Sequence, residues 1–129
     1  MPFIHKEIET EFFKTNVLEE GILENFIKEG VHFDAKKAWE LKKANLELAN
    51  GEKYVVLLQA GYLADITKDA REAVSSSEYL MSTKAKALLV TSMGQKIMGN
   101  FYLSINKPVM KTAVFSEREK AIEWLRKQL

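Results

Sequence analysis

The residues of this chain that could do acid–base chemistry gather around position 67. Asp65 could pair with Asp69 or Glu72, and paired carboxylates act as general acid and base when their side chains converge. Acidic residues at the start of a helix also interact favourably with the helix dipole, and that role involves no chemistry. We therefore predict no catalytic residue here and expect that the protein is not an enzyme.

Thr67 stands among these acids and has two possible roles. Its side-chain oxygen can cap the following helix by accepting a hydrogen bond from a backbone amide of the first turn. It could also be a phosphorylation site, because Lys68 and Arg71 would attract a phosphate group at the start of the helix. We favour the cap and keep the phosphosite as the alternative.

Other common kinds of site have no support in the sequence. The chain has two histidines, His5 and His32, and neither has a second ligand at a recognised metal spacing. It has no cysteine, no glycine-rich phosphate loop and no Gly-x-Ser-x-Gly element. We predict no metal and no cofactor.

Composition limits the partners and the compartment. The 129 residues suit a single domain over positions 1–129. Nineteen basic against eighteen acidic side chains leave a net charge of +1, which favours neither nucleic acid nor an anionic membrane. The first residues lack the apolar run of a signal peptide, and no apolar stretch has the length of a membrane span. We expect a cytoplasmic protein.

The element that positions residue 67 is a strand over residues 54–58. Five consecutive apolar residues predict a strand that is buried on both faces, at the centre of a helix-covered sheet. The loop 59–66 and the helix that starts at Thr67 follow it. Because parallel sheets gather ligands at the carboxyl ends of their strands, residues 59–67 are the first place to look for function.

The other elements complete an α/β fold. Alternating residues 6–14 predict an edge strand, residues 16–21 a turn, and residues 22–28 a second strand of an antiparallel hairpin. Asp34 is placed to cap a helix over residues 35–50, with Gly51 at its exit. The lysines of this helix are assigned mainly to a solvated face: Lys36, Lys37, Lys42 and Lys43.

The second half alternates helices and strands. We predict helices over residues 67–83 and 94–106, strands over residues 85–91 and 109–115, and a last helix that begins at a capping box of Ser116 and Glu119. The order is β-β-α-β-α-β-α-β-α, which predicts a five-stranded mixed sheet with flanking helices.

The helix predicted over residues 94–106 has more large apolar residues than one core face uses. Met98 belongs to its core stripe, whereas Tyr102 and Leu103 lie beside that stripe. Flexible methionine beside aromatic residues suits an adaptable contact surface, and a groove between helices could bury the same atoms. Both interpretations stay open.

Three stretches carry a resemblance to a known family: the strand at residues 54–58 with Gly61 after it, the strand at 86–91, and residues 112–125. In these the chain resembles the STAS-like domains, the fold of anti-sigma-factor antagonists, and more closely an uncharacterised bacterial branch of them. Regulatory members carry a phosphorylatable hydroxyl after the central strand, in acidic surroundings. Thr67 matches the hydroxyl, whereas Ile66 stands where the preceding Asp would be and Leu58-Gln59 where the acid at the end of the strand would be.

The function that we expect is a non-enzymatic module that binds a protein partner or a second copy of itself. The alternative is a small-molecule-binding protein or minor enzyme with a pocket at the carboxyl ends of the strands. The candidate interaction surface comprises Gly61, Tyr62, Asp65, Thr67, Met98, Tyr102 and Leu103.

We predict a homodimer, because an extra apolar helix face in a monomer would stay exposed. Light scattering at micromolar concentration should give the mass of a dimer, and Tyr102→Glu combined with Leu103→Glu should lower solubility or stability. A monomer that is insensitive to both changes contradicts the prediction.

Overall fold

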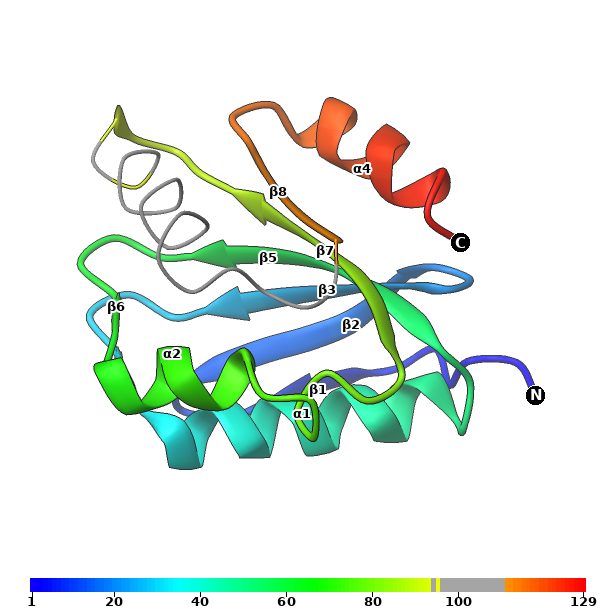
Figure 1. Cartoon of the computed structure of the whole chain (residues 1–129), viewed down its shortest axis with the longest axis horizontal. Coiled ribbons are helices and arrows are strands. Elements are labelled where there is room, and N and C mark those ends of the chain that lie inside the picture. Colours follow the sequence, from blue (N-terminus) through cyan, green and yellow to red (C-terminus); the bar gives the residue numbers. More distant parts are fainter. Residues whose placement is uncertain (94, 96–110) are drawn as a thin grey trace.

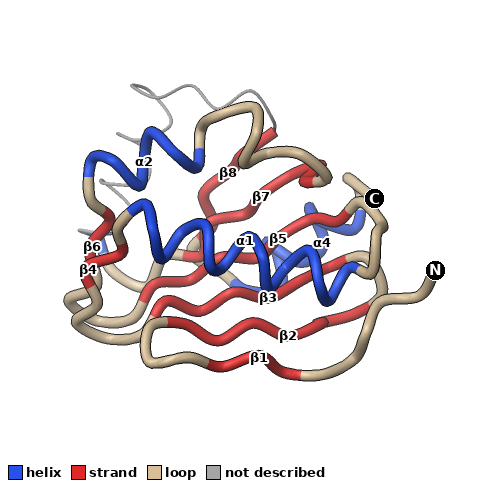
Figure 2. The backbone as a smooth tube through the Cα atoms, turned by 90° about the horizontal axis from the view of Figure 1, so that it is seen from below, coloured by secondary structure: helices blue, strands red, loops and turns tan. Residues whose placement is uncertain are grey.

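The described part of the chain folds into a mixed sheet of six strands with helices on both faces, and a smaller sheet of two strands, β4 (His32–Phe33) and β6 (Asp65–Ile66), lies at one end (Figures 1 and 2). The computed structural model describes residues 1–93, 95 and 111–129. The strands are β1 (Glu7–Glu9), β2 (Phe13–Glu19), β3 (Ile22–Ile27), β4 (His32–Phe33), β5 (Tyr54–Ala60), β6 (Asp65–Ile66), β7 (Thr83–Leu89) and β8 (Lys111–Phe115). The described helices are α1 (Ala35–Ala49), α2 (Lys68–Val74) and α4 (Arg118–Arg126).

The large sheet has the strand order β1-β2-β3-β5-β7-β8. The pairs β1–β2 and β2–β3 are antiparallel, and β3, β5, β7 and β8 are parallel to one another. The parallel part and the interior position of the strand from Tyr54 are confirmed, and so is an antiparallel hairpin before them. The turn predicted over residues 16–21 is too long, because β2 continues through Glu19 in register with β3. The predicted number of five strands is wrong, because six strands pair in this sheet.

The extra strand arises at Thr10, inside the segment that was predicted as one strand. Its Oγ1 atom accepts hydrogen bonds from the backbone amides of Phe12 and Phe13, at 3.1 and 3.2 Å, and its own amide donates to the Phe13 carbonyl. These bonds turn the chain back, so β1 and β2 become separate strands. The next turn is at Gly21, whose φ of 92° favours glycine.

Strand β5 is buried from both sides, as its apolar run predicts. Val55 and Leu57 pack with Ile122 and Leu125 of α4, whereas Tyr54 belongs to a cluster on the face that α1 covers. Figures 1 and 2 show α1 and α2 together on one face of the sheet and α4 on the other. The alternation of side chains along one strand therefore serves two separate packing layers.

Helix α1 agrees with its prediction at both ends. The side chain of Asp34 accepts a hydrogen bond from the Lys37 amide at 3.0 Å, and Asn50 and Gly51 leave the helix with φ values of 52° and 87°. These left-handed residues are the common way to end a helix.

Helix α2 is shorter than predicted and ends at Val74 instead of near Thr83. The hydroxyls of Ser75 and Ser76 donate to the carbonyls of Arg71 and Ala73, at 2.9 and 2.7 Å. Such local bonds compete with the helical pattern, so the serines close the helix. Strand β7 consequently begins at Thr83, two residues before the predicted start.

The capping box predicted at Ser116 does not form. The N-cap residue of α4 is Glu117, and its side chain makes no capping bond. A capping box needs its acidic residue three positions after the cap, and Lys120 occupies that position here. Two ion pairs join α4 to the sheet. Arg118 pairs with Glu24 of β3 at 2.5 Å, and Arg126 pairs with Glu19 of β2 at 2.8 Å.

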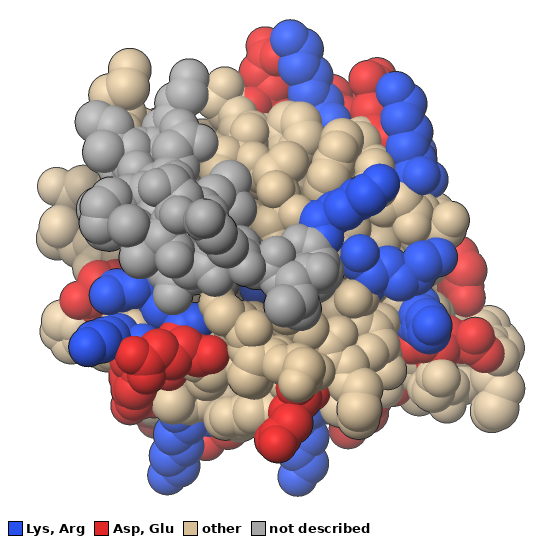
Figure 3. Space-filling view, viewed as in Figure 1, with Lys and Arg blue, Asp and Glu red and all other residues tan. Residues whose placement is uncertain are grey.

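The helix predicted over residues 94–106 lies outside the described residues, apart from Gln95, and so do Met98, Tyr102 and Leu103 of the predicted interaction surface. Of the surface that is described, Figure 3 shows acidic side chains near the margin of one face and basic side chains both at the margin and across the face; the net charge of the chain is +1. Within the described ranges, no helix combines the length and the apolar character that crossing a membrane requires.

The two predicted helix starts give a matched test of capping. Thr67 Oγ1 accepts a hydrogen bond from the Ala70 amide at 3.3 Å, which confirms its role as a cap, whereas Ser116 makes no such bond. Thr67→Val should therefore lower the free energy of unfolding by about 1 kcal/mol, and Thr67→Asp should retain most of it. Ser116→Ala should change it by less than about 0.3 kcal/mol. Urea unfolding measures all three, and a larger loss for Ser116→Ala than for Thr67→Val would contradict the assignment of the caps.

Candidate binding cavity

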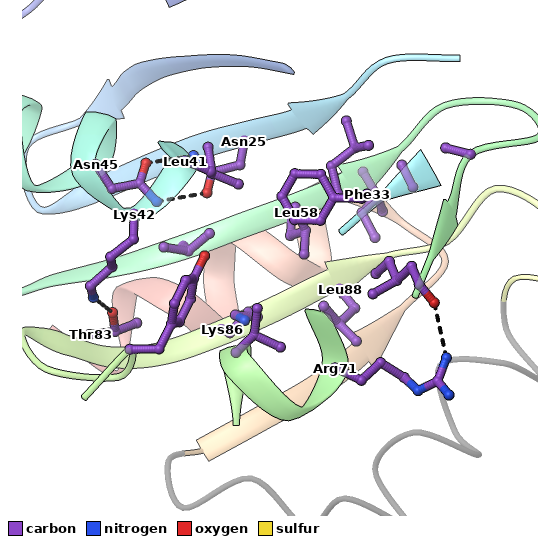
Figure 4. Close-up of a pocket in the computed structure, with 18 of the residues that line it drawn as sticks. Asn25, Phe33, Leu41, Lys42, Asn45, Leu58, Arg71, Thr83, Lys86 and Leu88 are labelled. Carbon is purple, nitrogen blue, oxygen red and sulfur yellow. Dashed lines mark hydrogen bonds between the residues drawn. The ribbon is translucent and has the colours of Figure 1, made fainter. Parts of the chain in front are cut away.

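A cavity of about 360 Å³ lies between the large sheet and the helices α1 and α2. Its walls come from both helices and from strands β3, β5 and β7, and most of them are apolar (Figure 4). The apolar lining includes Ile27, Phe33, Leu41, Val56, Leu58, Val74, Leu80, Leu88 and Val90. Polar side chains lie toward its two ends.

Lys42 of α1 lies at the end formed by the amino ends of β5 and β7. Only 3% of this residue is exposed, and its Nζ atom donates to Tyr54 Oη at 2.7 Å, Thr83 Oγ1 at 2.8 Å and the Met81 carbonyl at 2.6 Å. These three acceptors match the three protons of the ammonium group. The solvated position predicted for Lys42 is therefore wrong.

A signal for this burial was present in the sequence. Lys42 stands four residues after Ala38 and three before Asn45, and both of these lie on the buried stripe of α1. Residues at such spacings share one face of a helix. The prediction places Lys42 off this stripe together with Lys43, and of the two only Lys43 is exposed.

Lys86 of β7 is the second buried lysine, with 9% of its surface exposed. Its neighbours Ala85 and Ala87 pack toward α4, so the alternation of the strand directs Lys86 to the cavity face. Within the described part of the chain its ammonium group has no hydrogen-bond acceptor and no carboxylate partner. Its Nζ atom lies 6.0 Å from the centroid of the Tyr79 ring, and the Nζ atom of Lys42 lies 5.5 Å from the same centroid.

Burial changes the protonation of this end of the cavity. Burial, with a smaller contribution from the Lys86 charge, lowers the pKa of Lys42 to about 8. Burial alone lowers the pKa of Lys86 to about 8, and it raises the pKa of Tyr54 to about 12. Because three oxygens hold the protons of Lys42, we expect Lys86 to lose its proton first as the pH rises.

A neutral polar cluster lies beside Lys42. The side-chain amides of Asn25 and Asn45 bond each other in both directions, at 2.8 and 3.0 Å, and the Thr15 hydroxyl donates to Asn45 at 3.0 Å. All three residues are at least 96% buried. These bonds join α1 to β2 and β3 and satisfy polar groups that would otherwise be costly to bury.

The other end of the cavity lies near the carboxyl ends of the strands. Arg71 donates to the Ile66 carbonyl at 2.9 Å, and Gln95 donates to the Ala60 carbonyl at 3.3 Å. Asp65 supplies the one carboxylate among the described lining residues, and it bonds His32 at 2.6 Å. Figure 4 shows Arg71 and Phe33 at this end, away from Lys42, Thr83 and Lys86.

The loop predicted as an interaction surface divides among several roles. Gly61 is buried, and a Cβ atom there would lie 2.8 Å from the Glu29 backbone nitrogen, so this glycine permits close packing of two loops. Tyr62 is 73% exposed, and Leu63 beside it is 72% exposed. Asp65 lines the cavity, and Thr67 caps α2.

The carboxylates near residue 67 that were considered as a pair have different partners: Asp65 bonds His32, and Asp69 bonds the start of α2. The Asp69 carboxylate accepts hydrogen bonds from the Thr67 hydroxyl and the Ala70 amide. The bond from Thr67 is the main cause that lowers the pKa of Asp69. Both side chains therefore serve the start of α2, as the helix-dipole interpretation predicts.

The fold and cavity define an α/β protein whose mixed sheet is covered by helices on both faces. The chain belongs to the family described as Domain of unknown function (DUF7793), whose model matches residues 16–129. The match begins within β2 and includes every described residue that lines the cavity. No curated protein matches the chain, and no solved structure matches it either.

Lys86→Met should raise the free energy of unfolding at pH 7, by on the order of 1–3 kcal/mol, because it removes a buried charge that has no described counter-charge. The size of this difference in unfolding free energy depends on pH. Between the folded pKa of about 8 and the ordinary value of 10.5, the unfolded state holds a proton that the folded state has lost, so the wild-type protein gains stability as the pH rises. The advantage of the variant should therefore shrink by pH 10.

Lys84→Met is the matched control for this comparison, because Lys84 lies on the same strand and is exposed. Its unfolding free energy should stay close to that of the wild type at both pH values. Urea unfolding at pH 7 and pH 10 provides the measurement. A Lys86→Met variant that is less stable than the wild type at pH 7 would show that the ammonium group has a stabilising partner.

Proposed function

We propose that the protein binds a small molecule with an anionic group and an apolar body in this cavity. The observation that carries the proposal is the pair of buried lysines, Lys42 and Lys86, at one end of an apolar chamber whose single described carboxylate is Asp65 at the other end. This is the alternative that the sequence left open, and the arrangement of charge favours it over a purely apolar interface.

The charge argument rests on desolvation. Moving a charge into a low-dielectric interior is costly unless a counter-charge or a set of hydrogen bonds compensates it. Lys42 has three oxygen acceptors, whereas Lys86 has a ring face at 6.0 Å. A ligand carboxylate beside Lys86 would supply the missing acceptor and counter-charge. The positive Lys42 group nearby would add to the attraction.

The shape argument rests on the walls. The volume of about 360 Å³ lies within the range of small-molecule pockets, and such pockets are lined mainly by apolar side chains with a few polar groups. Leu58 and Leu88 line the chamber between its two polar ends (Figure 4). A linear or ring-shaped hydrocarbon body fits these walls, and its anionic group would lie near the amino ends of β5 and β7.

A protein-interaction role is a second candidate, supported by a different feature. Leu63 has a φ of 62° and is 72% exposed next to the exposed Tyr62. A bulky residue in the left-handed region is strained, and strain at an exposed loop is often connected with binding. We also propose that the domain is STAS-like, because the succession of strands and helices from Tyr54 onward carries that resemblance. The sizing experiment described above tests self-association.

Octanoate and octanol form a matched pair of probes for the cavity, because they share an apolar chain and differ in charge. Octanoate should bind more tightly at pH 7 in titration calorimetry, and its affinity should fall above pH 8 as Lys86 loses its proton. Lys86→Met should remove most of the preference for octanoate, and Lys84→Met should keep it. Equal affinities for both probes in the wild-type protein would contradict the proposal.

A further inference from the structure

We propose that the amino group of Lys86 forms a reversible imine with an aldehyde whose apolar body occupies the cavity. The proposal deepens the proposed function, since it rests on the same cavity accepting apolar ligands, and it names a chemical class for some of them. The carrying observation is a lysine that is 91% buried, lines an apolar chamber and has no described hydrogen-bond acceptor.

A nucleophilic lysine needs a free lone pair and access to the ligand. A carboxylate beside it would hold the proton on nitrogen, and among the described residues no carboxylate lies beside Lys86. Lys42, in contrast, donates to three oxygens and has no group left to react. The geometry therefore distinguishes the two buried lysines and selects Lys86.

The protonation of Lys86 agrees with this role. A pKa of about 8 leaves part of the population as free amine near neutral pH, whereas an ordinary exposed lysine has roughly one free amine in a thousand. Desolvation of a lysine in an apolar pocket is a known route to an amine nucleophile. The Lys86 charge in turn contributes to the lowered pKa of Lys42, which indicates that the two ammonium groups lie near each other.

The reaction needs no oxidant or reductant. The nitrogen lone pair attacks the aldehyde carbon, so a C–N bond forms while the C=O π bond breaks, and one proton passes from the nitrogen to the oxygen to give a carbinolamine. Loss of that oxygen as water, with the second proton from nitrogen, leaves the C=N bond of the imine. The nearby positive charge of Lys42 would stabilise negative charge that develops on the oxygen during the attack. Hydrolysis reverses every step.

Octanal with sodium borohydride tests the proposal on the full-length protein. Borohydride reduces an imine to a stable secondary amine, and mass spectrometry after digestion locates the octyl group. At limiting octanal and pH 7.5, Lys86 should be labelled at least about tenfold more than the exposed Lys84, because more of it is free amine. Labelling of Lys86 should increase from pH 6 to pH 8.5, and octanoate should compete with it.

Two variants and the pattern of results distinguish imine formation at Lys86 from anion binding in the cavity. Lys86→Met should lose the preferred label, Lys84→Met should keep it, and circular dichroism should show that both variants are folded. Labelling spread evenly over exposed lysines, or labelling that Lys86→Met leaves unchanged, would overturn the imine. Octanoate binding without preferred labelling would support the anion-binding cavity and reject the imine. Preferred labelling of Lys86 without octanoate binding would support the imine and reject the anion-binding cavity.

Discussion

Polar side chains on one buried stripe of helix α1 bond to four strands of the sheet, and the rest of the structure depends on these hydrogen bonds. The Lys42 ammonium group is bonded to oxygens at the beginning of β5 and β7, and Asn45, three residues later, is bonded to Thr15 of β2 and Asn25 of β3. Polar bonds in a low-dielectric interior are directional and costly to leave unmade. They therefore fix the position of α1 over the sheet more specifically than apolar contacts alone would.

This arrangement leaves space between α1, α2 and the sheet, and it fills one end of that space with positive charge. Lys42 is compensated by its acceptors, whereas Lys86 on the adjacent strand has an aromatic face and the cavity beside it. A buried group without compensation lowers stability, and such groups are often kept where function needs them. Lys42 thus has a structural role, whereas Lys86, with the same side chain and similar burial, is the group to which the proposed function assigns ligand binding.

The location of this charge differs from the usual rule for parallel sheets. Ligands commonly bind at the carboxyl ends of the strands, and there the chain places Gly61, the small sheet of β4 and β6, and the exposed Tyr62. The cavity reaches this edge at Arg71 and Gln95, but its lysines lie toward the amino ends of β5 and β7. The reason is the path of the chain: Lys42 bonds Thr83, the first residue of β7, so these segments meet at the amino ends of the strands.

The sequence by itself determined the elements whose signals are local. The apolar run from Tyr54 marked the buried strand, and the caps at Asp34 and Thr67 marked the starts of α1 and α2, because propensity and capping depend on a few neighbouring residues. The extra strand and the early end of α2 followed from side-chain bonds at Thr10 and Ser75, which a periodic pattern does not describe. Helix α4 starts after Glu117 without a side-chain capping bond, so no local capping signal marks its true start. Only the tertiary structure decided the cavity. Lys42 and Lys86 are 44 positions apart in the sequence, and each resembles a solvated lysine until α1 and β7 pack together and remove water from both.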